Sequence, residues 1–121
     1  MKKSPRVIWL EENVTGQLIL DIGFVGEYEE SVVHKSIVDE NPNSTVVGLD
    51  IKKDIVNHTR DEGVRGDMFQ LPFGDNTFDT VVFAEVLEHI PNPVDSLNEI
   101  GRVLSNQGNL FLTTPNPFGV Y

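Results

Sequence analysis

Short apolar runs alternate along the chain with stretches whose apolar residues recur at helical spacing. The apolar runs predict buried strands at residues 17–22, 45–50, 79–84 and 109–114, with a shorter strand near Val64 and Arg65. The helical spacing predicts helices over residues 28–40 and 52–62, and a third that begins at Asn92-Pro93 and repeats through Leu104. Strands that alternate with helices in this way predict a parallel sheet covered by helices.

The order of these elements predicts how the sheet is wound. Right-handed crossovers give an α/β, doubly wound, Rossmann-like sheet with the strand order 3-2-1-4-5. Ligands of such sheets bind outside the carboxyl ends of the strands, at the switch point between the first and fourth strands. Residues that follow those strands are therefore the ones to search for chemistry.

The chain has 121 residues, which predicts one domain. We expect a helical or irregular segment over residues 1–16, a core over 17–114 and a tail over 115–121. The apolar stretch Val7 to Leu10 is too short for a signal peptide, and no apolar run approaches the ~20 residues of a membrane span. These features predict a cytoplasmic location.

Charge and cysteine content narrow the function classes. Asp and Glu number 19 against 9 Lys and Arg, a formal charge of −10, which disfavours nucleic acid and anionic membranes as partners. The absence of Cys excludes disulfides, thiolate metal sites and a Cys nucleophile. No pair of His residues with a carboxylate appears at metal-ligand spacing, so no metal is expected.

Three strand ends carry residues suited to a nucleoside ligand. Gly23 follows the first strand, where a glycine lets a ligand approach the backbone, although an ordinary turn would look the same. Asp50 ends the second strand and could accept hydrogen bonds from ribose hydroxyls, or be a solvated strand-end residue. Asp67 could accept a hydrogen bond from an exocyclic amine of a base. Met68 could pack on the face of that base or belong to the core. Either a nicotinamide dinucleotide or S-adenosylmethionine would suit these residues.

The segment over residues 66–90 separates the two ligands. It reads GDMFQLPFGDNTFDTVVFAEVLEHI and closely resembles the class I S-adenosylmethionine-dependent methyltransferases, in particular the small-molecule group with the pattern GDxxxLPFxDxSFDxVxxxxxLEHI. The resemblance continues through PNPVDSLNEIGRVLSNQGNLFLTTPN and covers about residues 17–117. It implies a methyltransferase core that uses S-adenosyl-L-methionine and a small-molecule acceptor.

The resemblance also implies cofactor-binding roles for individual residues. They lie beside the methionine part (Asp21, Gly23 and Phe24), the ribose (Asp50), the adenine (Ile51, Asp67 and Met68) and the reactive methyl (Ala84 and Glu85). The resemblance implies direct in-line transfer of the methyl group, driven mainly by positioning of the acceptor against that methyl. His89 is the catalytic candidate as a general base, although a role of His89 and Glu88 in the loop structure is the favoured interpretation. We expect His34 and His58 to be solvated.

The glycine turn departs from the family pattern, because Val25 and Glu27 stand where the family usually has glycine. This departure favours an alternative function, a non-catalytic S-adenosylmethionine-binding or interaction module. A nicotinamide-dependent oxidoreductase is a weaker alternative, since the full G-x-G-x-x-G spacing is missing.

The length is short for this family, whose fold usually ends with a further helix and an antiparallel strand pair. Only residues 115–121 remain after the strand at 109–114, so we expect that strand to be an uncovered sheet edge. Three explanations stay open: the chain is a fragment of a longer protein, it is a natural minimal form, or two copies pair. If the chain is as given, we expect a homodimer formed through this edge or through the apolar segment Val7 to Leu10.

Overall fold

The computed structural model describes residues 4–23, 28–50 and 62–114. Its elements follow one another in the order α1 (Pro5–Asn13), β1 (Leu18–Ile22), α2 (Tyr28–Glu40), β2 (Thr45–Asp50), β3 (Glu62–Arg65), β4 (Phe78–Ala84), the 3₁₀ turn η2 (Leu87–His89), α3 (Pro93–Val103) and β5 (Leu104–Thr113). The helix predicted over 52–62 falls on residues outside the described ranges, except for Glu62, which belongs to β3. The segment before β1 is helical over most of its described length.

The five strands form one parallel sheet in the order β3-β2-β1-β4-β5, which confirms the predicted order. In its register Asp21 pairs with Val82 and Ala84 with Thr113, so the carboxyl ends of β1, β4 and β5 lie along one edge. The switch point between β1 and β4 lies on that same edge, where the rule for doubly wound sheets places a ligand.

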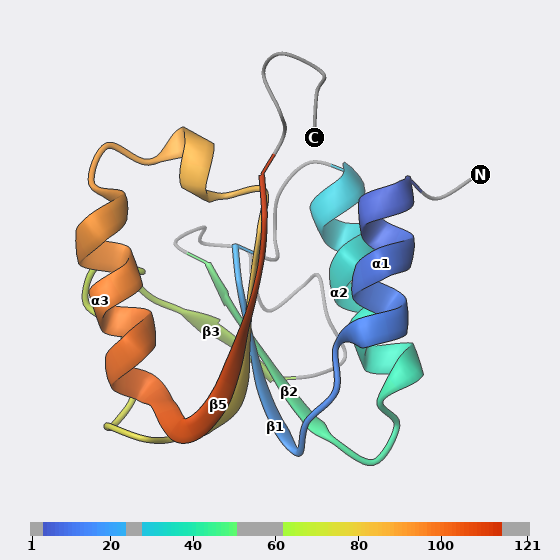
Figure 1. Cartoon of the computed structure of the whole chain (residues 1–121), viewed down its shortest axis with the longest axis horizontal. Helices are drawn as coiled ribbons and strands as arrows, with labels where there is room; N and C mark the ends of the chain where they lie inside the picture. Colours follow the sequence, from blue (N-terminus) through green and yellow to red (C-terminus); the bar gives the residue numbers. More distant parts are fainter. Residues whose placement is uncertain (1–3, 24–27, 51–61, 115–121) are drawn as a thin grey trace.

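Helices cover both faces of the sheet. Figure 1 shows α3 on one side and α1 with α2 on the other. Two apolar clusters fill the layers: Ile100 and Val103 of α3 pack on one face, while Leu10 of α1 and Ile37 of α2 pack on the other. Because both faces are covered, the central strands are apolar nearly throughout rather than alternating.

The junction between α3 and β5 differs from the prediction. The helical repeat was expected to include Leu104, but α3 ends at Val103 and Leu104 pairs with Phe78 as the first residue of β5. The register then shifts, so that Thr80 pairs with Asn109. Gly108 lies inside this irregularity, where a Cβ would stand 2.8 Å from Leu104 Cδ2 and 3.2 Å from the Asp79 carbonyl oxygen. Pairing with β4 therefore overrides the local helical pattern.

Helix starts follow the sequence signals in part. Ser4 caps α1, since its hydroxyl accepts from the Val7 amide at 3.4 Å, and Pro5 occupies the first turn. Asn92 precedes Pro93 at the start of α3, but its side chain makes no cap hydrogen bond, contrary to the expected Asn cap. Within the described residues no helix is long and apolar enough to cross a membrane.

Candidate functional site

A buried contact between an aspartate and a histidine lies at the end of β1. Asp21 is 2% exposed, and its Oδ2 lies 2.8 Å from His34 Nδ1 on α2. Burial raises the pKa of Asp21 above its ordinary value, and the contact with His34 offsets this only in part. The expectation that His34 is solvated is wrong, because its ring is buried beside this carboxylate; His58 lies outside the described residues.

Gly23 closes the turn after β1 with a positive φ of 76°. Its amide donates to the Leu49 carbonyl oxygen at 2.7 Å, and a Cβ at this position would stand 2.8 Å from Val86 Cγ2. Only glycine satisfies both the left-handed backbone and this close approach. The ends of β1 and β2 and the segment after β4 are thus drawn together at one point.

Asp50 ends β2 and is 7% exposed. Its carbonyl oxygen accepts from the Gly66 amide at 2.9 Å, which ties the end of β2 to the loop after β3. The predicted site residues Phe24 and Ile51 lie outside the described residues, as do Val25 and Glu27 of the glycine turn.

The loop after β3 carries Asp67 and Met68. Asp67 is exposed, and its Oδ1 accepts from the Phe69 amide at 2.8 Å, a local turn that fixes the carboxylate. Met68 is half-buried against the cluster beneath α3, and its carbonyl oxygen accepts from the Ser96 hydroxyl at 3.3 Å. The loop is therefore anchored to α3 at the point where both predicted ligand contacts lie.

A second anchor of this loop comes from Arg102 and Glu99 of α3, which the sequence reasoning missed. The Arg102 guanidinium donates to Glu99 at 2.7 Å, to the Phe73 carbonyl oxygen at 2.8 Å and to Leu71 at 3.0 Å. It also donates to Asp75 Oδ1 at 2.9 Å. The hydrogen bond from Arg102 lowers the pKa of Glu99, and the hydrogen bonds to Glu99 and Asp75 raise the pKa of Arg102. The opposite charges three residues apart on one helix were the available signal.

The end of β4 is strained. Ala84 is buried, and Glu85 after it has a φ of 58°, an unusual value for a residue with a side chain. The Glu85 amide donates to the Thr113 carbonyl oxygen at 2.9 Å. Its Oε1 lies 3.3 Å from Arg6 Nε, whereas the buried Oε2 finds no hydrogen-bond partner among the described residues. A buried carboxylate oxygen in this state fits a site that a ligand completes.

His89 ends the 3₁₀ turn after β4. Its side chain is 72% exposed, with Nε2 3.6 Å from Glu88 Oε2, and its amide donates to the Val86 carbonyl oxygen. Glu88 in turn accepts from the Thr114 hydroxyl at 3.5 Å. The contacts of His89 lie within the loop after β4, and Glu88 joins this loop to the residue that follows β5. A catalytic role for His89 stays a prediction.

The structure thus brings three acidic side chains, Asp21, Asp50 and Glu85, to the carboxyl ends of the adjacent strands β1, β2 and β4. Asp67 lies on the loop beyond β3. The acidic edge fits a cationic sulfonium and the hydroxyls of an adenosine, because carboxylates accept hydrogen bonds and attract positive charge. The Oε2 of Glu85, which has no hydrogen-bond partner among the described residues, supports this fit.

A parallel sheet in this order, with an acidic edge at its switch point, defines a doubly wound, Rossmann-like domain. The sequence profile described as "Methyltransferase domain" matches residues 20–112, and the chain belongs to this family. The match begins within β1 and ends within β5, so it includes the carboxyl ends of β1, β2, β3 and β4.

Individual proteins that are similar to this chain also carry methyltransferase names. The chain is 29% identical to a ubiquinone/menaquinone biosynthesis C-methyltransferase of Roseobacter denitrificans over 95% of this chain and 50% of the relative. It is 36% identical to a demethylmenaquinone methyltransferase of Staphylococcus carnosus over 55% of this chain and 31% of the relative. A Bacillus halodurans protein provisionally classed as a methyltransferase superposes with a TM-score of 0.74 at 27% identity, over 90% of this chain and 50% of that one. The chain thus spans half or less of the length of these proteins.

Proposed function

We propose that this chain binds S-adenosylmethionine at the carboxyl ends of β1, β2 and β4, and that it is the cofactor-binding core of an enzyme that methylates a small molecule. The observation that carries the proposal is the acidic edge at the switch point, with Asp21 and Asp50 buried and one oxygen of Glu85 left unpaired among the described residues. When bound, S-adenosylmethionine supplies an electrophilic methyl group on a sulfonium.

Each side chain has a binding or orienting role in this proposal. The Asp50 carboxylate accepts hydrogen bonds from the ribose hydroxyls, and Asp67 accepts from the adenine amine beside Met68. Gly23 lets the ligand reach the backbone, while Asp21 and Glu85 supply negative charge near the sulfonium. Phe24, Ile51 and Ala84 complete the proposed contact set. Because the reaction is a displacement in line, positioning of the acceptor is the main contribution of the protein.

The names of the relatives support a small-molecule acceptor, since one is a ubiquinone/menaquinone biosynthesis C-methyltransferase and another a demethylmenaquinone methyltransferase. The family match disfavours a nicotinamide-dependent oxidoreductase. A non-catalytic module that binds S-adenosylmethionine remains the second candidate, because Val25 and Glu27 replace glycines of the family turn. The single-domain boundaries, the cytoplasmic location and the homodimer also stay predictions from the sequence.

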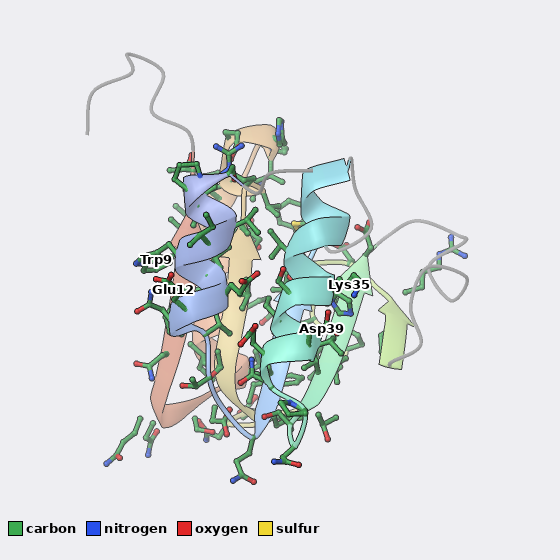
Figure 2. The ribbon with its side chains drawn as sticks, turned by 90° about the vertical axis from the view of Figure 1, so that its right-hand side faces the viewer. Trp9, Glu12, Lys35 and Asp39 are labelled. Carbon is green, nitrogen blue, oxygen red and sulfur yellow. The ribbon has the colours of Figure 1, made fainter. Side chains whose placement is uncertain are left out.

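Calorimetric titration with S-adenosylmethionine and S-adenosylhomocysteine tests the proposal. We expect both to bind, and Asp50→Ala to weaken them about tenfold or more, since hydrogen bonds to a charged group contribute about 1.5–3 kcal/mol each. Asp39→Ala is the matched control, because it removes the same charge from the exposed face of α2 (Figure 2) and should leave the affinity unchanged. Absence of binding at millimolar ligand would contradict the proposal, and binding without turnover on any acceptor would favour the module.

A further inference from the structure

The carboxylate of Asp21 lies where its charge is unfavourable for the fold. It is on the α2 side of the sheet, because side chains alternate along a strand and its neighbours Leu20 and Ile22 belong to the cluster beneath α3. Burial raises the pKa of Asp21, and the like charge of Asp50 raises it further. Ionisable groups in such surroundings cluster at functional sites.

His34 of α2 opposes the effect of burial on Asp21. Its Nδ1 lies 2.8 Å from Asp21 Oδ2, and both side chains are buried. The hydrogen bond with His34 and the charge of its ring both lower the pKa of Asp21. The contact with His34 therefore favours the ionised form of this carboxylate.

The other elements around Asp21 bring no group with the same effect among the described residues. β2 contributes Asp50, which is an acid, and β4 contributes the apolar Val82 opposite Asp21 in the register. α1 adds apolar side chains to the same layer. Glu85, the acid that follows β4, makes its ion pair with α1. Within the described part of the chain, the ionisation of Asp21 thus depends on His34.

We propose that His34 is a positioning residue, which donates from Nδ1 to Asp21 and keeps that carboxylate ionised and oriented for a cationic group of the methionine part of S-adenosylmethionine. The inference rests on the proposed function, in which Asp21 lies beside the methionine part. His34 touches no reacting atom and acts through Asp21.

Calorimetric titration with S-adenosylhomocysteine across pH tests this role, because that ligand keeps the ammonium group. We expect the affinity of the wild type to rise with pH as Asp21 loses its proton. His34→Leu should weaken binding about tenfold or more at the acid end of the profile, and the difference should narrow as pH rises. Because Asp50 and Glu85 are present in both proteins, the difference between the two profiles reports on position 34.

His34→Asn is the rescue variant. The amide nitrogen of asparagine is bonded to Cγ, as Nδ1 is in histidine, so it can donate to Asp21 and should restore binding to within about threefold of the wild type. Lys35→Leu is the matched control, because it removes a 2.8 Å hydrogen bond to a carboxylate, that of Asp39, from the outer face of the same helix (Figure 2). It should leave the pH profile unchanged.

A second ligand separates positioning from a general loss of structure. 5′-Methylthioadenosine keeps the adenosine but lacks the amino-acid part, so His34→Leu should not change its affinity. Ring ¹⁵N shifts of the wild type should show a proton on His34 Nδ1 at neutral pH, and His34→Asn assigns this signal among the three histidines. The ring shifts need no variant to bind ligand, so they decide even if His34→Leu does not fold.

Three results would overturn the inference: the same pH profile for the wild type and His34→Leu, equal weakening of both ligands, or a His34 Nδ1 without a proton. The last result would mean that Asp21 carries the proton of the pair. If S-adenosylhomocysteine binds the wild type and any of these results is found, the proposed function stands and only the role of His34 fails. If neither ligand binds at millimolar concentration, the proposed function fails and His34 has no cofactor to position.

Discussion

Replacement of Gly23 by alanine tests how the structure holds the carboxyl ends of its strands together. The φ of 76° places an added side chain in the left-handed region, and the new Cβ would meet Val86 Cγ2 at 2.8 Å. Carbon atoms in van der Waals contact prefer about 3.5–4.0 Å, so Val86 or the backbone must shift. The substitution therefore introduces two separate penalties at one site.

The backbone penalty and the clash with Val86 differ in size, and only the clash can be removed by a second substitution. Left-handed backbone costs a non-glycine residue about 1–2 kcal/mol, and overpacking of a buried site costs about 1–3 kcal/mol. Gly23→Ala should thus lower the free energy of unfolding by about 2–5 kcal/mol. Val86→Ala removes the clashing methyl and by itself costs about 1.6 kcal/mol for two buried methyl groups. The double variant keeps the backbone penalty and loses the clash.

Urea unfolding of the wild type, both single variants and the double variant gives the coupling between the two positions. We expect the double variant to be more stable than the sum of the single effects implies, by about 1–3 kcal/mol. Effects that add to within about 0.5 kcal/mol would refute the reasoning, because they would show that Val86 does not restrict the turn after β1.

Three further outcomes follow from the contacts described above. Because burial raises the pKa of Asp21, the folded protein retains a proton that the unfolded chain loses, and the wild type should lose stability as pH rises from about 4 through the raised pKa. Asp21→Asn should flatten this pH dependence, as urea unfolding across that range would show. The hydrogen bond from Arg102 lowers the pKa of Glu99, so the stabilisation by Glu99 is present above its ordinary pKa and is lost as pH falls through its lowered pKa. Glu99→Gln removes this contribution, and thermal melts of the variant should depend less on pH in the acid range. Leu110→Lys on the edge strand β5 should reduce self-association of this chain in sedimentation velocity, and a wild type that stays monomeric at high concentration would refute the predicted homodimer.

The strand order was predictable because it depends on short-range signals. Apolar runs such as residues 79–84 and the polar or glycine residues that follow them mark where parallel strands end, and the handedness of crossovers supplies the order. The same signals placed Asp21, Asp50 and Glu85 at one edge. Their adjacency follows from topology and required no knowledge of side-chain contacts.

Long-range contacts decided what the sequence left open. His34 lies three residues before the buried Ile37, on the inward face of α2. Histidine is intermediate in its tendency to be buried, and the Asp21 carboxylate 2.8 Å from its ring is a contact that the local pattern does not show. Leu104 continues a helical repeat, yet it pairs with Phe78, which is far away in the sequence. Arg102 likewise anchors a loop about thirty residues upstream, a contact that no local pattern encodes.

The most direct test of the central claim is a backbone NMR titration of the ¹⁵N-labelled chain with S-adenosylhomocysteine. The structure predicts that the largest shift changes fall on amides at the carboxyl ends of β1, β2 and β4, at Gly23, Asp50 and Glu85, and that Asp39 and Leu104 stay unchanged. Shift changes confined to other surfaces, or none at millimolar ligand, would contradict the claim that this edge holds the cofactor.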